Sequence, residues 1–120
     1  MHPVKSADRR LANIFSAKFK PFVYTGGVSL GGTVLQLADD LPIGVGFHVY
    51  RMPPGMTARP RRHNGHEQFL VPEGEPIEND GTVFKAGDMV WLRGGTEHCS
   101  HTPNGCLLAV HITATETTVD

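Results

Sequence analysis

Two histidines and one glutamate are the residues of this sequence whose side chains are best suited to bind a divalent transition metal. His63 and Glu67 stand four residues apart in RPRRHNGHEQFLVPEG (residues 59–74), and His98 follows in GTEHCS. Imidazole nitrogen and carboxylate oxygen are ligands for iron, manganese, nickel and zinc. Polar residues near strand ends usually face water. These residue types alone therefore leave two interpretations open, a metal site and a solvated edge.

Three arginines, Arg59, Arg61 and Arg62, precede these residues. They would bind a phosphate or carboxylate if they faced a pocket, and they would form a solvated edge otherwise. Successive residues of a strand point to opposite faces, so Arg62 is separated from the other two. At most two of the three can serve one site.

The elements that position these residues are predicted to be strands. After Phe22, short runs rich in β-branched and aromatic residues alternate with glycines, as strands joined by tight turns do. The strand candidates are IGVGFHVYRM (43–52), EQFLVPEG (67–74), GTVFKAGD (81–88), DMVWLRGG (88–95) and CLLAVHIT (106–113), with a hairpin turn at NDG (79–81). Such regular spacing of short strands predicts an all-β sandwich or barrel.

The segment at residues 43–52 alternates in a way that predicts one core face. Its apolar residues Ile43, Val45, Phe47 and Val49 share that face, and His48 and Tyr50 lie on the other. His48, Tyr50 and Trp91 are candidates for a pocket that binds substrate or for an interface, with packing in the core as the alternative.

One short helix is predicted near the N-terminus. In SADRRLANIF, Ser6 is a suitable N-cap, and Leu11, Ile14 and Phe15 have helical spacing. We expect the helix over about residues 7–15.

Length and composition predict a single domain over residues 1–120. With 39% apolar residues, 19% charged residues and a net charge of −1, the chain has no overall field that would attract nucleic acid or an anionic membrane. The sequence has no run of apolar residues long enough to span a bilayer and no apolar leader, which predicts a cytoplasmic protein. Cys99 and Cys106 are then expected as reduced thiols, with a disulfide across HTPNG as the alternative.

The order of the glycines adds a resemblance to a known family. Gly55, Arg61, His63, Glu67 and Gly74 follow one another at the intervals of the first cupin motif, with Arg61 where that motif has its first histidine.

A second set of residues lies downstream at the intervals of the second cupin motif. It consists of Gly87, Arg93, Gly95, His98 and Thr102, with Arg93 in place of a proline and Thr102 in place of an asparagine. The closing segment GTEHCSHTPNGCLLAVHI is similar to the subgroup that includes zinc-binding anti-sigma-factor domains and the acetylacetone-cleaving dioxygenase.

The resemblance implies a small antiparallel β-barrel of the jelly-roll type, the double-stranded β-helix, over about residues 22–114. It also implies a central pocket that holds iron, manganese, zinc or nickel, and a homodimer formed through the sheets. The residues that match ligand positions of the family are His63, Glu67 and His98.

Arg61 departs from the family pattern because a guanidinium has no lone pair for a metal. At about 5 Å from a divalent ion, its charge would be repelled by roughly 6 to 7 kcal/mol at an effective dielectric of 20. We therefore expect one of two arrangements: Arg61 pairs with Glu67 in a metal-free site, or it turns to the mouth and binds a substrate carboxylate. His66 and His101 have the wrong strand parity to act as ligands beside Glu67 and His98.

Three functions follow as hypotheses. The first is a metal-dependent, dioxygenase-like enzyme acting on a diketone, enol or carboxylate, in which Glu67 is a ligand and potential base and Arg61 holds the substrate. The second is a non-catalytic module that senses a ligand or a metal. The third is a metal-free isomerase with His48, His63 or His98 as general base.

Overall fold

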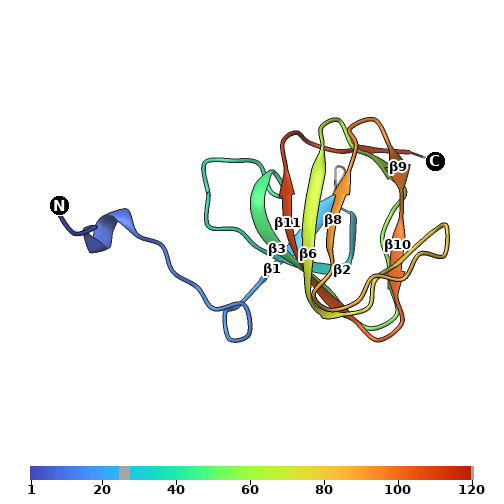
Figure 1. Cartoon of the computed structure of the whole chain (residues 1–120), viewed down its shortest axis with the longest axis horizontal. Coiled ribbons are helices and arrows are strands. Elements are labelled where there is room, and N and C mark those ends of the chain that lie inside the picture. The colour runs from blue at the N-terminus through green and yellow to red at the C-terminus, as the bar shows by residue number, and fades with distance from the viewer. Residues whose placement is uncertain (25–27, 120) are drawn as a thin grey trace.

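The described part of the chain forms twelve strands and one short 3-10 turn (Figure 1). The computed structural model describes residues 1–24 and 28–119. The elements are η1 (Ser6–Asp8), β1 (Lys20–Tyr24), β2 (Val28–Leu35), β3 (Gly46–Met52), β4 (Met56–Thr57), β5 (Arg61–Arg62), β6 (Glu67–Gly74), β7 (Ile77–Glu78), β8 (Met89–Leu92), β9 (Glu97–His98), β10 (Ser100–Thr102), β11 (Cys106–Ile112) and β12 (Thr117–Thr118).

The strands form one large sheet and two small ones, and every pairing is antiparallel. The large sheet has the order β1-β2-β3-β11-β6-β8, and the small sheets have the orders β4-β10-β7 and β12-β5-β9. Figure 1 shows the sheets wrapped around a common interior. The predicted all-β barrel is confirmed.

The core lies between the sheets and continues into the site. Its buried residues include Met52, Met56, Phe69, Val71, Leu108 and Val110. In β6 the inward positions Glu67, Phe69 and Val71 are buried, while the outward Gln68 and Leu70 are exposed. Because strand side chains alternate with a period of two, Glu67 shares its face with the core.

The face predicted for residues 43–52 is wrong. Phe47 is 64% exposed on the outer surface and Ile43 is exposed, whereas His48 is buried and Tyr50 half-buried. Val49 is buried as expected. The interior at this level is a cavity lined by polar as well as apolar side chains, so apolar character alone does not identify the inward face here.

The strand predicted at residues 81–88 is also wrong, because only Val83 forms an isolated bridge, to Ile77. Gly81 and Gly87 bracket the segment with positive φ angles of 90° and 95°, which break regular strand geometry. The expected turn at residues 79–81 is present, since the amide of Gly81 donates to the carbonyl of Glu78 at 2.9 Å.

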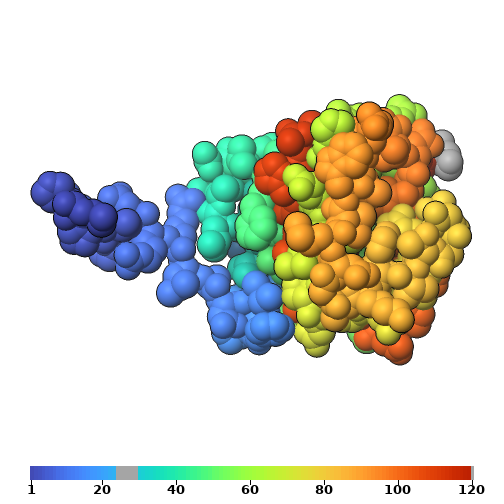
Figure 2. All heavy atoms as spheres, in the orientation of Figure 1, coloured from blue at the N-terminus to red at the C-terminus, as the bar shows by residue number. Residues whose placement is uncertain are grey.

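The predicted N-terminal helix is reduced to the 3-10 turn η1. Lys5 precedes this turn without a side-chain cap, and Leu11 and Phe15 are exposed. A helix this short is marginal unless tertiary contacts stabilise an apolar face, and the first residues instead extend away from the barrel (Figure 2). Among the residues that the structure describes, no helix has the length and apolarity needed to cross a bilayer.

Candidate metal centre

Backbone hydrogen bonds connect the two segments that carry His63, Glu67 and His98. The amide of His63 donates to the carbonyl of Thr96 at 3.0 Å, and the amide of Gly95 donates to the carbonyl of His63 at 2.6 Å. Beside them, Arg61 of β5 pairs in register with His98 of β9. The loop before β9 is thereby fixed against the entry to β6.

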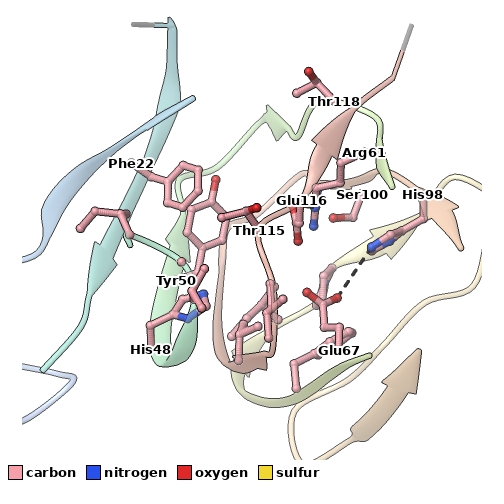
Figure 3. A pocket seen from close by; sticks show the side chains of 18 of the residues that line it. Phe22, His48, Tyr50, Arg61, Glu67, His98, Ser100, Thr115, Glu116 and Thr118 are labelled. Atoms are coloured by element: carbon pink, nitrogen blue, oxygen red, sulfur yellow. Dashed lines mark ion pairs between the residues drawn. The ribbon is translucent and has the colours of Figure 1, made fainter. Parts of the chain in front are cut away.

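The three side chains meet at one point in the interior. One donor atom from each lies within 4.8 Å of the others. Oε1 of Glu67 is 3.4 Å from Nε2 of His63 and 3.7 Å from Nε2 of His98, and the two Nε2 atoms contact each other directly. Figure 3 shows the His98 ring directed at Glu67. The sequence-predicted trio is brought together.

A second carboxylate stands behind each histidine. Oε2 of Glu78 accepts a hydrogen bond from Nδ1 of His98 at 2.7 Å. Oε1 of Glu116 lies 3.2 Å from Nδ1 of His63, at ion-pair distance but out of line for a hydrogen bond. With its proton on Nδ1, each ring turns the lone pair of Nε2 towards Glu67. Carboxylates in this position commonly orient metal-binding histidines.

Burial makes the charge of Glu67 costly without a cation. Burial raises the pKa of Glu67, and the nearby positive charge of Arg61 opposes the rise only in part. Among the described residues that line the cavity, three glutamates, Glu67, Glu78 and Glu116, face one arginine, Arg61. A divalent cation at the meeting point of the donors would balance the two excess negative charges. The residues present therefore fit a divalent metal.

Arg61 lies opposite Glu116, a partner that neither of the expected arrangements included. Its Nε is 2.7 Å from Oε2 of Glu116, and the two side chains are 13% and 20% exposed. Burial acts to raise the pKa of Glu116, but His63 and Arg61 together lower it. The carboxylate described opposite Arg61 thus comes from the C-terminal segment, and binding of a substrate carboxylate by Arg61 stays a prediction.

A cavity of about 180 Å³ opens beside these residues. Figure 3 shows Phe22, His48 and Tyr50 on one side and Arg61, Glu116 and His98 on the other. The apolar part of the lining comprises Phe22, Val23, Ile43, Val45, Phe69, Leu108, Val110 and Ile112. The cavity therefore has an apolar wall and an acidic end.

Besides Arg61, two of the three other predicted substrate-binding residues line this cavity, His48 and Tyr50. Nδ1 of His48 donates to the carbonyl of Gly46 at 3.1 Å, and burial lowers the pKa of His48, so its ring is neutral at pH 7. The ring of Tyr50 contacts Phe22 edge-on, with centroids 5.4 Å apart.

The apolar wall includes a loop that one side chain holds in place. Nε2 of Gln36 donates to the carbonyls of Ala38 and Pro42 at 3.0 and 3.1 Å, and its Oε1 accepts from the amide of Gly44 at 2.8 Å. Ile43 and Val45 reach the cavity from this loop.

Trp91, the third predicted substrate-binding residue, lies on the outside of the barrel, half exposed. Its neighbour there is the ring of His66, whose Nδ1 accepts from the amide of Gly94. His101 is exposed, and Arg62 pairs with Glu97 at the surface. Strand parity placed all of these except Trp91 correctly.

Sequence reasoning missed Glu78 and Glu116. Glu78 immediately precedes the predicted turn at residues 79–81, and that position gave a weak signal that it returns towards the barrel. No feature of the segment TATETTVD indicated a role for Glu116, because its approach to Arg61 depends on the pairing of β12 with β5.

Cys99 and Cys106 are both free thiols. Burial raises the pKa of Cys106 to about 11, so this side chain is a packed thiol rather than a reactive one.

No protein-family model and no curated protein matches this sequence. Solved structures do match the fold. A cupin described as RmlC-like from Ralstonia eutropha superposes with a TM-score of 0.73 at 16% identity, over 90% of this chain and 70% of that one. A putative acetylacetone dioxygenase from Methylibium petroleiphilum has a TM-score of 0.72 at 16% identity, over 100% and 86% of the two chains.

The anti-sigma protein ChrR, in complex with SigE of Rhodobacter sphaeroides, matches with a TM-score of 0.62 at 18% identity. That match covers 88% of this chain and 50% of the other. Identities at this level identify a fold and leave the activity open. Together with the two motifs and the antiparallel barrel, they show that this chain has the cupin fold.

Proposed function

We propose that this protein is a metal-dependent enzyme that acts on a small oxygenated molecule, through dioxygenase-like cleavage of a diketone or enol. The observation that carries the proposal is the convergence of His63, Glu67 and His98, with a carboxylate behind each histidine. The acetylacetone dioxygenase among the structural neighbours supports the reaction class by analogy of fold.

His63, Glu67 and His98 would hold the ion, and a metal in this site supplies Lewis acidity towards a carbonyl or enol oxygen. Two imidazoles and one carboxylate leave coordination positions open on the cavity side. Iron, manganese, nickel and zinc all suit this donor set.

The remaining cavity residues would bind and orient the substrate. Its apolar body would pack against Phe22 and Ile43, which places its oxygens towards the acidic end. His48 is neutral and buried, and its Nε2 is an acceptor for a proton or a hydrogen bond from the substrate. Glu67 would serve as a ligand, with its negative charge stabilised by the ion.

The test begins with metal analysis of protein purified without a histidine tag. We expect about one equivalent of a divalent metal per chain after reconstitution and release of that metal in His98→Ala. Oxygen uptake by the iron(II)-loaded protein is then measured with short 1,3-diketones and enols. Absence of stoichiometric binding for all four metals at micromolar concentration would rule the proposal out.

A non-catalytic sensor is the second candidate. It is favoured by the arginine at a position where cupins use a histidine, and by the anti-sigma protein among the structural neighbours. Tight metal binding without turnover of any carbonyl compound would support it. The metal-free isomerase hypothesis relies on His48, His63 or His98 as base and predicts activity that survives chelation.

We also propose a cytoplasmic homodimer. Phe47, Leu70, Met89 and Trp91 are exposed apolar residues on β3, β6 and β8 of the large sheet, and a symmetric partner would cover them. The two free thiols suit a reducing compartment. Sedimentation at micromolar concentration separates a dimer from a 13.1 kDa monomer.

A further inference from the structure

We propose that Glu116 makes the cavity select neutral oxygenated molecules over carboxylates, because it occupies the one arginine that would otherwise bind an anion. This inference rests on the proposed function and specifies its substrate class. It concerns Arg61, which stands where the first cupin motif has a histidine, and its partner Glu116.

The fold holds Glu116 against Arg61 through the last strand. β12 pairs with β5 so that Thr118 lies opposite Arg61 in the ladder, and Glu116 enters the cavity just before that strand. The resulting contact of 2.7 Å joins two side chains that are both mostly buried. In such surroundings a charged pair is screened much less than at the surface.

The guanidinium is also engaged at a second nitrogen. Its Nη1 donates to the carbonyl of Arg59 at 3.4 Å, while Nε faces Glu116. A bidentate grip on a carboxylate requires two adjacent N–H groups aligned in a fork. A substrate carboxylate would therefore have to displace Glu116, which would leave that buried glutamate without its guanidinium.

The net charge of the site also disfavours a carboxylate substrate. Within the described lining, the acidic end carries three glutamates and one arginine, so a bound divalent ion brings its formal charge to zero. An incoming carboxylate would add an unbalanced negative charge to a mostly buried site. A neutral ketone or alcohol of the same size would not.

The experiment compares two probes of nearly the same shape, acetylacetone and acetoacetate, on zinc-loaded protein, in which redox turnover is blocked. Isothermal calorimetry gives the ratio of their affinities at saturating zinc. We expect the wild type to favour acetylacetone. In Glu116→Gln the ratio should shift towards acetoacetate by roughly ten- to a hundredfold, the range that a charge-assisted hydrogen bond supplies.

The matched control is Glu97→Gln. Glu97 pairs with Arg62, the neighbour of Arg61, at 2.9 Å on the exposed side of the same strands. Its loss should leave the affinity ratio unchanged. The double variant Arg61→Met/Glu116→Gln removes both charges of the pair, and in it the gain for acetoacetate should disappear.

An unchanged ratio in Glu116→Gln, with zinc and acetylacetone still bound, overturns this inference and leaves the proposed function standing. A gain that persists in the double variant also overturns it, since the gain would then not depend on Arg61. If none of iron(II), manganese, nickel and zinc binds to these proteins, the proposed function fails and this inference falls with it. Should Glu116→Gln fail to fold, the double variant decides. A wild-type affinity ratio supports the inference, because Arg61 then contributes nothing to carboxylate binding while Glu116 holds it. A stronger preference for acetylacetone contradicts it, because Arg61 would then have bound acetoacetate in the wild type.

Discussion

The two faces of the short strands around the site have nearly the same residue types and opposite chemistry. On β5, Arg61 points inward to Glu116 and Arg62 points outward to Glu97. The inward pair is 13% and 20% exposed, and the outward pair is 47% and 52% exposed. Adjacent residues of one strand therefore form two different ion pairs. Arg61–Glu116 lies in the cavity, and Arg62–Glu97 is screened by water. Strand parity, more than residue type, decides which polar residues are functional.

The largest effect should come from removing an inward ligand. His98→Ala is expected to lower metal affinity by at least about ten- to a hundredfold, the loss seen when only a supporting partner is removed, because a direct donor is lost. Calorimetric titration with zinc, nickel and manganese measures it. His101→Ala, in the next strand and exposed, is the control and should bind as the wild type does. Equal losses in both variants would contradict the assignment of faces.

Restoring the family residue at the inward arginine should increase metal affinity. Arg61→His replaces a repelled cation by an imidazole, and we expect binding to tighten by about tenfold or more, comparable to the effect of a supporting partner. Arg62→His changes the outward neighbour and should have no such effect. Unchanged affinity in Arg61→His would place Arg61 outside the metal's surroundings.

The pH dependence of stability should reveal the buried carboxyl group. Burial raises the pKa of Glu67 above its ordinary value of 4.5, so the folded state holds this proton more tightly than the unfolded state. In metal-free protein its stabilising contribution is complete below pH 4.5 and is lost as the pH rises through the raised pKa. Urea unfolding between pH 4 and 8 should show this loss in the wild type and its absence in Glu67→Gln. Saturating zinc should reverse the trend, because the ion binds the ionised carboxylate.

The smallest effect should come from the outward pair. Arg62→Ala is expected to change the free energy of unfolding by about 1 kcal/mol or less, as exposed ion pairs do. High salt should remove what difference there is, since it screens surface charges. A loss of several kcal/mol would mean that this face is covered, for example by a second copy of the chain.

The barrel and the metal trio could be predicted because the glycines, His63, Glu67 and His98 stand at the intervals of the two cupin motifs, and that resemblance implies both. Glycines at fixed intervals mark turns, and parity within β6 determines the inward position of Glu67. Glu116 was beyond such reasoning, since its contact joins residues 55 positions apart through a two-residue strand. The failures at Phe47 and at residues 7–15 have a shared cause: apolar patterns predict burial only where something exists to cover them.

The loop behind the apolar wall has a consequence for how this protein could diversify. Gln36 holds residues 38–44 through hydrogen bonds to their backbone, so it fixes the path of the loop without specifying its side chains. Substitutions at Ile43 or Val45 could therefore reshape the cavity while the metal donors, on other strands, keep their positions. Substitutions in this loop would therefore change the size of the substrate that fits and leave the metal donors unchanged.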